Sequence, residues 1–252
     1  MVSGYSPGRR LRQGLVRHYA GGVEGLSYRH DLHGGLGTAS GDINGDGYDD
    51  LVVGQLSGVD ETAGDADAPG GLVGVYYGGG EGPANAEGSG TAPQWWSQNS
   101  PGVPGAGEQR DAWGNDLSVA DVDGDGFADV AVGAPGEDVH GEQRAGAVWL
   151  LHGSREGVTG TGSQSFDQNT RGIPRAAEAG DGWGAQVRLV DTDGDGRAEL
   201  VAAAPDENAG DGAVWLLTAS GDGLLADGSR SYGAAALGGS GHGAHFGAVI
   251  DE

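Results

Sequence analysis

Short apolar runs separated by glycine-rich polar segments recur along the whole chain. Apolar residues alternate with small or polar ones at 117–119 and 130–132, and residues 147–151 form a compact apolar run bounded by glycine. A period of two residues is typical of a strand, and no segment sustains a helical period long enough for a helix. A further strand is expected around residues 164–167. The pattern therefore predicts an all-β chain of short strands.

This arrangement of strands repeats along the sequence. Residues 96–135 match residues 166–205 at a constant shift without gaps, and Gly-Ala-Val-Trp-Leu-Leu at 146–151 recurs unchanged at 212–217. Residues 71–77 fill the same place in an earlier, longer copy. Four short strands in about 70 residues, repeated, are typical of the blades of a β-propeller. One blade cannot bury both of its faces alone, so neighbouring copies are expected to stack.

Each copy carries a nine-residue acidic loop, at 42–50, 121–129 and 191–199. Every loop has an oxygen-bearing side chain at positions 1, 3, 5 and 9 and glycine at position 6. Ca²⁺ takes six to eight oxygen ligands, some of them backbone carbonyls. We expect about three structural Ca²⁺ ions, held by side chains and by the carbonyl at position 7. The expected ligands are Asp42, Asn44, Asp46, Tyr48, Asp50, Asp121, Asp123, Asp125, Phe127, Asp129, Asp191, Asp193, Asp195, Arg197 and Glu199.

The loops also allow two other interpretations. An EF-hand begins in the same way but needs glutamate at position 12, where this chain has Val53, Val132 and Ala202 between predicted strands. Acidic turns without metal are the other alternative, because turns favour Asp, Asn and Gly. Several carboxylates converging on one loop would repel one another unless a cation neutralised them, which favours the metal. Mg²⁺ is disfavoured because it demands tighter octahedral geometry and keeps its waters.

Composition narrows the possible partners. The 252 residues carry a formal net charge of −24, and all thirteen basic residues are arginine. Nucleic acid and anionic membranes would be repelled, and a phosphate loop that needs lysine is excluded. No apolar stretch approaches the length of a membrane span, so no membrane insertion is expected. The absence of cysteine excludes disulfides and thiolate metal sites. Residues 1–22 lack the apolar core of a signal peptide.

The ordered motifs resemble the FG-GAP repeat family, best known from the propeller heads of integrin alpha subunits. The family pattern is Phe-Gly, a strand, an acidic loop, a strand and Gly-Ala-Pro. Residues 113–135 and 183–205 fill all of these places, with Trp-Gly for Phe-Gly in both copies and Ala-Ala-Pro for Gly-Ala-Pro at 203–205. The first copy departs from the pattern at Leu36-Gly37 and at Gly54-Gln55. The resemblance covers about residues 34–252 and implies a propeller of integrin-alpha-like blades, with three full repeats and partial blades at both ends.

The implied repeats have the following boundaries. A partial blade or N-terminal segment covers 1–35, the full repeats cover 36–112, 113–182 and 183–245, and a further blade starts at 246–252. Residues 18–27 resemble the third strand of a blade, and Phe246–Ile250 resembles the start of a repeat. Integrin propellers have seven blades, for which repeats of this length would need roughly 450–490 residues. A homodimer or a longer parent chain could complete the propeller.

The resemblance implies a non-catalytic recognition or adhesion module, extracellular or at the cell surface, with a protein or glycan ligand. Function would then lie in loops 55–70, 92–112, 134–145 and 204–211, on the face opposite the metals. An accessory propeller of a secreted hydrolase and a truncated repeat fragment are the alternatives. No enzyme is expected. Ser6, in a Gly-x-Ser-x-Gly run, is assigned to a disordered terminus. His242 and His245 are expected to be solvated, whereas Trp95 is a candidate exposed binding platform.

Overall fold

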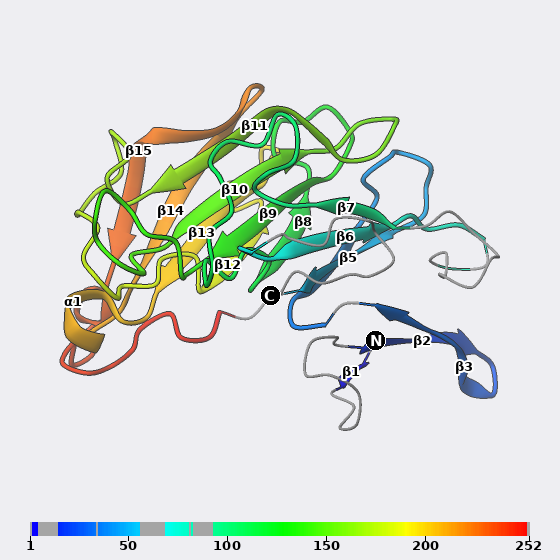
Figure 1. Cartoon of the computed structure of the whole chain (residues 1–252), viewed down its shortest axis with the longest axis horizontal. Helices are drawn as coiled ribbons and strands as arrows, with labels where there is room; N and C mark the ends of the chain where they lie inside the picture. Colours follow the sequence, from blue (N-terminus) through cyan, green and yellow to red (C-terminus); the bar gives the residue numbers. More distant parts are fainter. Residues whose placement is uncertain are drawn as a thin grey trace.

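The chain folds into β-sheets, as the sequence pattern predicts. The computed structural model describes residues 2–4, 15–33, 35–55, 69–80, 82 and 93–250. Three antiparallel sheets of four strands and one of three strands follow one another along the chain (Figure 1). The strands are β1 (Val2–Gly4), β2 (Leu15–Gly22), β3 (Gly25–His33), β4 (Thr38–Gly41), β5 (Asp50–Gln55), β6 (Leu72–Tyr76), β7 (Gln94–Trp96), β8 (Leu117–Ala120), β9 (Asp129–Ala134), β10 (Ala147–His152), β11 (Thr159–Asp167), β12 (Gln186–Val190), β13 (Glu199–Ala204), β14 (Ala213–Ser220) and β15 (Gly223–Tyr232).

Each four-stranded sheet is a meander in which strands pair in sequence order: β4 to β7, β8 to β11 and β12 to β15. The first strands of successive sheets lie beside one another, β4 next to β8 and β8 next to β12. The strand order and this stacking agree with FG-GAP blades, so the all-β fold is confirmed at the level of the blades.

The strands in the middle of each blade are buried on both faces, which explains their continuous apolar runs. In β9, Val130 and Val132 face the core shared with the first four-stranded sheet, while Ala131 faces the core shared with the third. In β10, Trp149 belongs to the core shared with the first four-stranded sheet, and Val148 belongs to the core shared with the third. Alternate side chains of a strand point to opposite faces. A single blade therefore contributes to two hydrophobic cores at once, and stacking is what buries it.

Close backbone contact between blades explains the glycines of the recurring motifs. A Cβ atom built on Gly133 would lie 2.0 Å from the carbonyl oxygen of Gly184 in the next blade. In the first copy, which departs from the motif, a Cβ on Gly54 would lie 1.9 Å from the carbonyl oxygen of Gly114. No side chain fits in such a contact. Gly54 thus keeps the glycine of Gly-Ala-Pro where the backbones of these two blades meet.

The Trp-Gly motif begins each new blade against the loop before it. The amide of Trp113 donates to the carbonyl of Gly70, and the amide of Trp183 donates to that of Ala145, both over 2.8 Å. Phe246 makes the corresponding bond to Asp211 over 3.1 Å. Leu36, in the departing first copy, is instead exposed. The start of a further repeat at residue 246 stays a prediction.

The N-terminal sheet packs on the first four-stranded sheet. Val16 of β2 and Leu32 of β3 share a buried cluster with Leu51, Val53 and Tyr76. β2 lies between β1 and β3 and turns tightly into β3. Residues 18–27 thus cover the end of β2, the turn and the start of β3, and their assignment to a partial blade stays a prediction.

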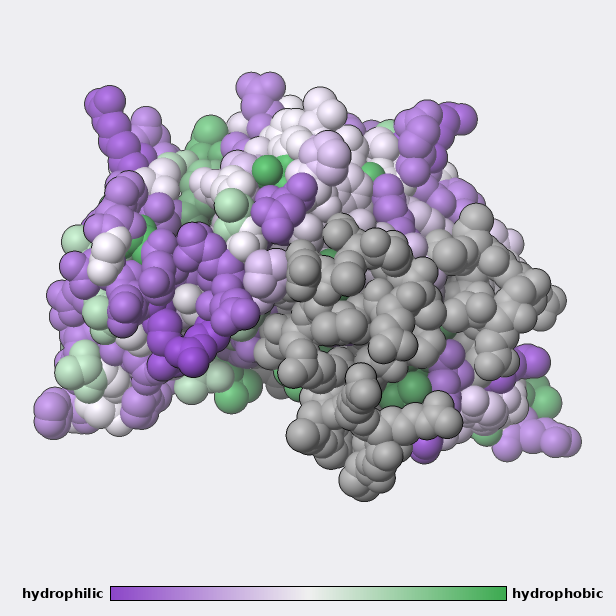
Figure 2. All heavy atoms as spheres, in the orientation of Figure 1, coloured by the Kyte–Doolittle hydropathy of each residue, from purple (hydrophilic) through white to green (hydrophobic). Residues whose placement is uncertain are grey.

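Helix is almost absent from the described residues. A single turn, α1 (Glu207–Gly210), contains two residues with non-helical angles, and a 3-10 turn spans Ala234–Leu237. Within the described part of the chain, no helix is long and apolar enough to cross a membrane. The coloured residues on the face seen in Figure 2 are mainly hydrophilic, with scattered hydrophobic ones.

Candidate metal centre

The three acidic loops join the first two strands of successive blades and lie next to one another. The amide N–H of Ala128 donates to the carbonyl of Asp42 over 3.0 Å, and that of Ala198 donates to the carbonyl of Asp121 over 2.8 Å. Each loop is therefore hydrogen-bonded to the loop before it. The result is a continuous row of carboxylates at one end of the blades.

Backbone amides fix the carboxylates inside each loop. In the second loop, Asp121 accepts the N–H groups of positions 4 and 6 over 2.7 and 3.0 Å. Asp123 accepts the N–H of position 5 over 3.1 Å, and Asp125 accepts that of position 7 over 2.9 Å. The third loop repeats all four distances. Side chains at positions 1, 3 and 5 are thus held in a fixed arrangement by the turn itself.

The carboxylate at position 9 is buried at the root of each loop. Asp129 accepts the N–H of Val122 over 2.9 Å and that of Gly153, after β10, over 3.0 Å. Asp50 is held in the same way, by amides on the loop and after β6. Glu199 is also buried and accepts the amide of position 2 over 2.8 Å. Position 9 therefore joins the loop to the third strand in the first two blades.

These donor sets fit a hard divalent cation. The carboxylates of Asp121, Asp123 and Asp125 offer ligand atoms within 4.8 Å of one another. A second such group joins Asp191 and Asp193 to Glu199 in the third loop. Burial, followed by the nearby carboxylates of Asp129 and Asp125, raises the pKa of Asp123. A bound cation would remove that charge crowding and supply the missing positive charge. The carbonyl at position 7 remains a predicted ligand.

The first loop is less acidic at its centre. Asn44 occupies position 3, and its amide group donates to Asp46 over 3.3 Å while its side-chain oxygen accepts the N–H of Asp46 over 3.0 Å. Among the described residues of this loop, no three carboxylates converge as they do in the other two. The difference supports the expectation that this loop binds calcium most weakly.

The third loop contains a cation of its own. Arg197 donates through Nη2 to Oδ2 of Asp195 over 2.7 Å, and both side chains are partly exposed. The sequence suggested only a carbonyl ligand at this position. The guanidinium now competes for one carboxylate oxygen of an expected ligand.

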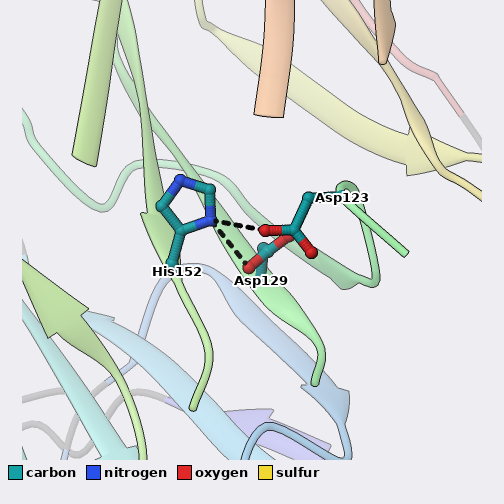
Figure 3. Close-up of side chains that lie close together, drawn as sticks. All are labelled: Asp123, Asp129 and His152. Atoms are coloured by element: carbon teal, nitrogen blue, oxygen red, sulfur yellow. Dashed lines mark hydrogen bonds and ion pairs between the residues drawn. The ribbon is translucent and has the colours of Figure 1, made fainter. Parts of the chain in front are cut away.

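His152 is a participant that the loop pattern does not reveal. Its Nδ1 atom lies 3.2 Å from Oδ1 of Asp129 and 3.5 Å from Oδ2 of Asp123 (Figure 3). A hydrogen bond to Asp129 is the main reason why the pKa of His152 is raised. His152 is the last residue of β10, far from the loop in sequence. Its place directly after the apolar run 147–151 is the one signal in the sequence.

Carboxylates also gather at the opposite end of the blades, where second and third strands connect. Gln98 donates to Oε2 of Glu137 over 2.8 Å, close to the buried Asp111. Burial, together with the charge of Asp111, raises the pKa of Glu137 to about 7. In the third blade the corresponding Glu207 pairs with Arg175 over 3.1 Å. Of these two blades, the one that contains Glu207 pairs its glutamate with an arginine and, among the described residues, the one that contains Glu137 does not.

The remaining sequence candidates fall into three groups. Trp96 packs against a hydrophobic core, whereas Trp95 lies over Gly74 and is half-buried. Trp95 therefore offers a smaller exposed surface for a ligand than the sequence suggested. Ser6 lies outside the described residues. His242 is fully exposed near Asp211 and His245 is exposed near Asp206, which agrees with solvated side chains.

Comparison with known proteins identifies the repeat. The FG-GAP repeat family model matches residues 113–151 and 183–217. The chain is 28% identical to integrin alpha pat-2 of Caenorhabditis briggsae over 235 residues, covering 70% of this chain and 18% of that protein. It is 29% identical to integrin alpha-5 of Xenopus laevis over 173 residues, covering 68% and 14%.

A second group of relatives consists of enzymes. The chain is 27% identical to the phosphatidylinositol-glycan-specific phospholipase D of Dictyostelium discoideum over 181 residues, covering 70% of this chain and 18% of the enzyme. The chain thus spans less than a fifth of the length of each of these relatives. The family model, the relatives and the blade geometry agree: the chain carries FG-GAP repeats at residues 113–151 and 183–217 and is similar to the integrin alpha family.

Proposed function

We propose that this chain is a calcium-stabilised, non-catalytic recognition module that binds a protein or glycan ligand. The observation that carries the proposal is the repeated loop, in which amide-fixed carboxylates converge at one end of each blade. Oxygen cages of this kind suit Ca²⁺, and sites of modest affinity suit the millimolar calcium outside cells. The proposed location is therefore extracellular or at the cell surface.

Calcium in this proposal is structural. The ligands stand between the first two strands of a blade, and position 9 also contacts the end of the third strand in two blades. A cation held there would connect three strands and, through the hydrogen bonds between loops, neighbouring blades. Binding to the native state alone would stabilise the fold by mass action.

The ligand surface is proposed at the other end of the blades. The connections that contain Glu142 and Gln98 lie there, whereas the acidic loops lie at the metal end. Binding residues are frequently placed on loops that a rigid scaffold positions. The connection between β9 and β10 projects a run of exposed polar side chains that includes Glu142 and Arg144.

Two matched charge reversals test this assignment. Glu142 and Glu156 are both exposed glutamates on loop tips, at the ligand end and the metal end respectively. A protein and glycan array probed in Ca²⁺ should yield a partner whose binding is weakened by Glu142→Arg and unaffected by Glu156→Arg. An array without any calcium-dependent partner, or equal losses in both variants, would contradict the proposal.

The similarity to the phospholipase D supports a second candidate function, an accessory propeller attached to a hydrolase. The blades would then contact an enzyme domain instead of a separate ligand. Finding a hydrolase domain in the parent chain, with hydrolysis that depends on the acidic loops, would favour this function over the first.

A further inference from the structure

Nitrogen and oxygen ligands meet at one place in the second blade. The Nδ1 atom of His152 and the carboxylates of Asp123 and Asp129 offer ligand atoms within 4.8 Å of one another (Figure 3). The other acidic group of this loop contains oxygen donors only and shares Asp123 with it. Imidazole is a ligand for Zn²⁺, Co²⁺ and related cations, whereas Ca²⁺ takes oxygen.

We propose that His152, Asp123 and Asp129 form a transition-metal site, distinct in chemistry from the oxygen cages proposed for calcium. The cations that it would take are of the borderline class represented by Zn²⁺ and Co²⁺. The two sites share carboxylates, so one cation displaces the other.

The distances match four-coordinate geometry. Ligand atoms around a tetrahedral Zn²⁺ with bonds of about 2.0–2.1 Å lie about 3.3–3.4 Å apart. Nδ1 of His152 lies 3.2 Å from the Asp129 oxygen and 3.5 Å from the Asp123 oxygen. The ligand atoms of Asp123 and Asp129 lie within 4.8 Å of each other, so closing the third edge around a cation needs only side-chain movement. A fourth position would remain for water, as at other zinc sites with three protein ligands.

Neighbouring groups hold these ligands in place. Asp129 is buried and accepts amides from Val122 and Gly153, which fixes both of its oxygens. The imidazole ring lies next to Gly162 and Gly223, with 3.5 Å and 3.4 Å from its nearest atoms to a Cβ built on each glycine. Such outer contacts orient metal ligands and strengthen binding.

A bulge in the blade aims His152 at the loop. The register between β10 and β11 shifts between Leu150 and His152. The register of the third blade shifts in the same place, between Leu216 and Thr218. Bulges redirect a side chain at the end of a strand. Thr218 is thus the structural equivalent of His152 without a nitrogen ligand, so only one of these two blades carries the mixed site.

The test uses Co²⁺, whose visible absorption distinguishes four-coordinate sites containing nitrogen from six-coordinate oxygen sites. Chelator-treated protein is titrated with Co²⁺ at neutral pH as wild type and as His152→Thr, Asp123→Asn and Asp193→Asn. Asp193 occupies in the third loop the position that Asp123 has in the second. His152→Thr copies the residue of the third blade.

We expect the intense band of a four-coordinate site in wild type and in Asp193→Asn. His152→Thr and Asp123→Asn should weaken it by at least tenfold, since losing an outer contact already costs about 10- to 100-fold. Added Ca²⁺ should reduce the wild-type band. A six-coordinate spectrum in wild type, or a His152→Thr titration identical to wild type, overturns the proposal. Asp123→Asn decides the matter should His152→Thr not fold.

Calcium is measured separately on the same proteins by thermal melting. His152→Thr should keep the rise in melting temperature with Ca²⁺, because it removes no oxygen ligand. Absence of that rise in wild type would contradict the proposed calcium function, while the Co²⁺ result would still decide the mixed site.

Discussion

Two tryptophans in one hydrophobic core allow a sharp test of the packing. Trp113 and Trp149 are 0% and 2% exposed, and both belong to the core between the first two four-stranded sheets. Trp149 donates its indole N–H to the carbonyl of Pro104 over 2.8 Å. The indole N–H of Trp113 has no partner among the described residues. The same substitution to phenylalanine should therefore have different costs at the two positions.

Both substitutions remove the same ring atoms, a loss of about 1–2 kcal/mol in burial and packing. At Trp113 the change also removes a buried donor without a partner, which relieves about 1–3 kcal/mol. At Trp149 it breaks a hydrogen bond worth about 0.5–1.5 kcal/mol. We expect Trp113→Phe to be nearly neutral and Trp149→Phe to destabilise by about 2–3 kcal/mol.

Urea unfolding at fixed Ca²⁺ concentration gives both free energies. A difference of about 2 kcal/mol corresponds to several degrees in melting temperature for a chain of this size. Equal losses at the two positions, or a larger loss for Trp113→Phe, would refute the hydrogen-bond reasoning.

Three further predictions follow from named side chains. Burial raises the pKa of Glu137 from 4.5 to about 7, so its protonated form stabilises the fold below pH 4.5 and this contribution is lost as pH rises to 7. Glu137→Gln should therefore flatten that part of the curve of unfolding free energy against pH, measured at saturating Ca²⁺. An unchanged slope would contradict this prediction. Asn44→Asp should tighten calcium binding at the first loop by about tenfold in calorimetry, through the added charge; weaker binding would reject this ranking. Asp116 joins two blades by accepting the amide N–H of Val187 over 2.8 Å. Asp116→Ala should therefore lower the free energy of unfolding by about 1–3 kcal/mol, whereas substitution of the exposed Asp31 by alanine should lower it by under about 1 kcal/mol. Equal losses in urea unfolding would refute this contrast.

Much of the fold could be predicted because each blade obeys a local pattern. Residues such as Val148 and Trp149 are apolar in succession because opposite faces of β10 meet different cores. The acidic loops were predictable for the same reason: the turn, its glycine and its carboxylates are contiguous, and local amides fix them.

Contacts between distant segments could not be predicted. His152 reaches the second loop only because a bulge redirects it, and no spacing in the sequence encodes that direction. The ion pair between Arg197 and Asp195 depends on a side-chain rotamer. Gly54-Gln55 departs from Gly-Ala-Pro in sequence, yet Gly54 keeps the close backbone contact with Gly114 of the next blade.

Thermal melting of the wild-type protein in Ca²⁺ and in EGTA tests the central claim most directly. Three structural ions would each add about 2.7 kcal/mol at a hundredfold excess over their dissociation constants. The melting temperature should therefore be higher in Ca²⁺, and calorimetry should count about three bound ions, as expected from the three loops. A melting curve that is the same in Ca²⁺ and in EGTA would contradict the claim that the acidic loops hold calcium.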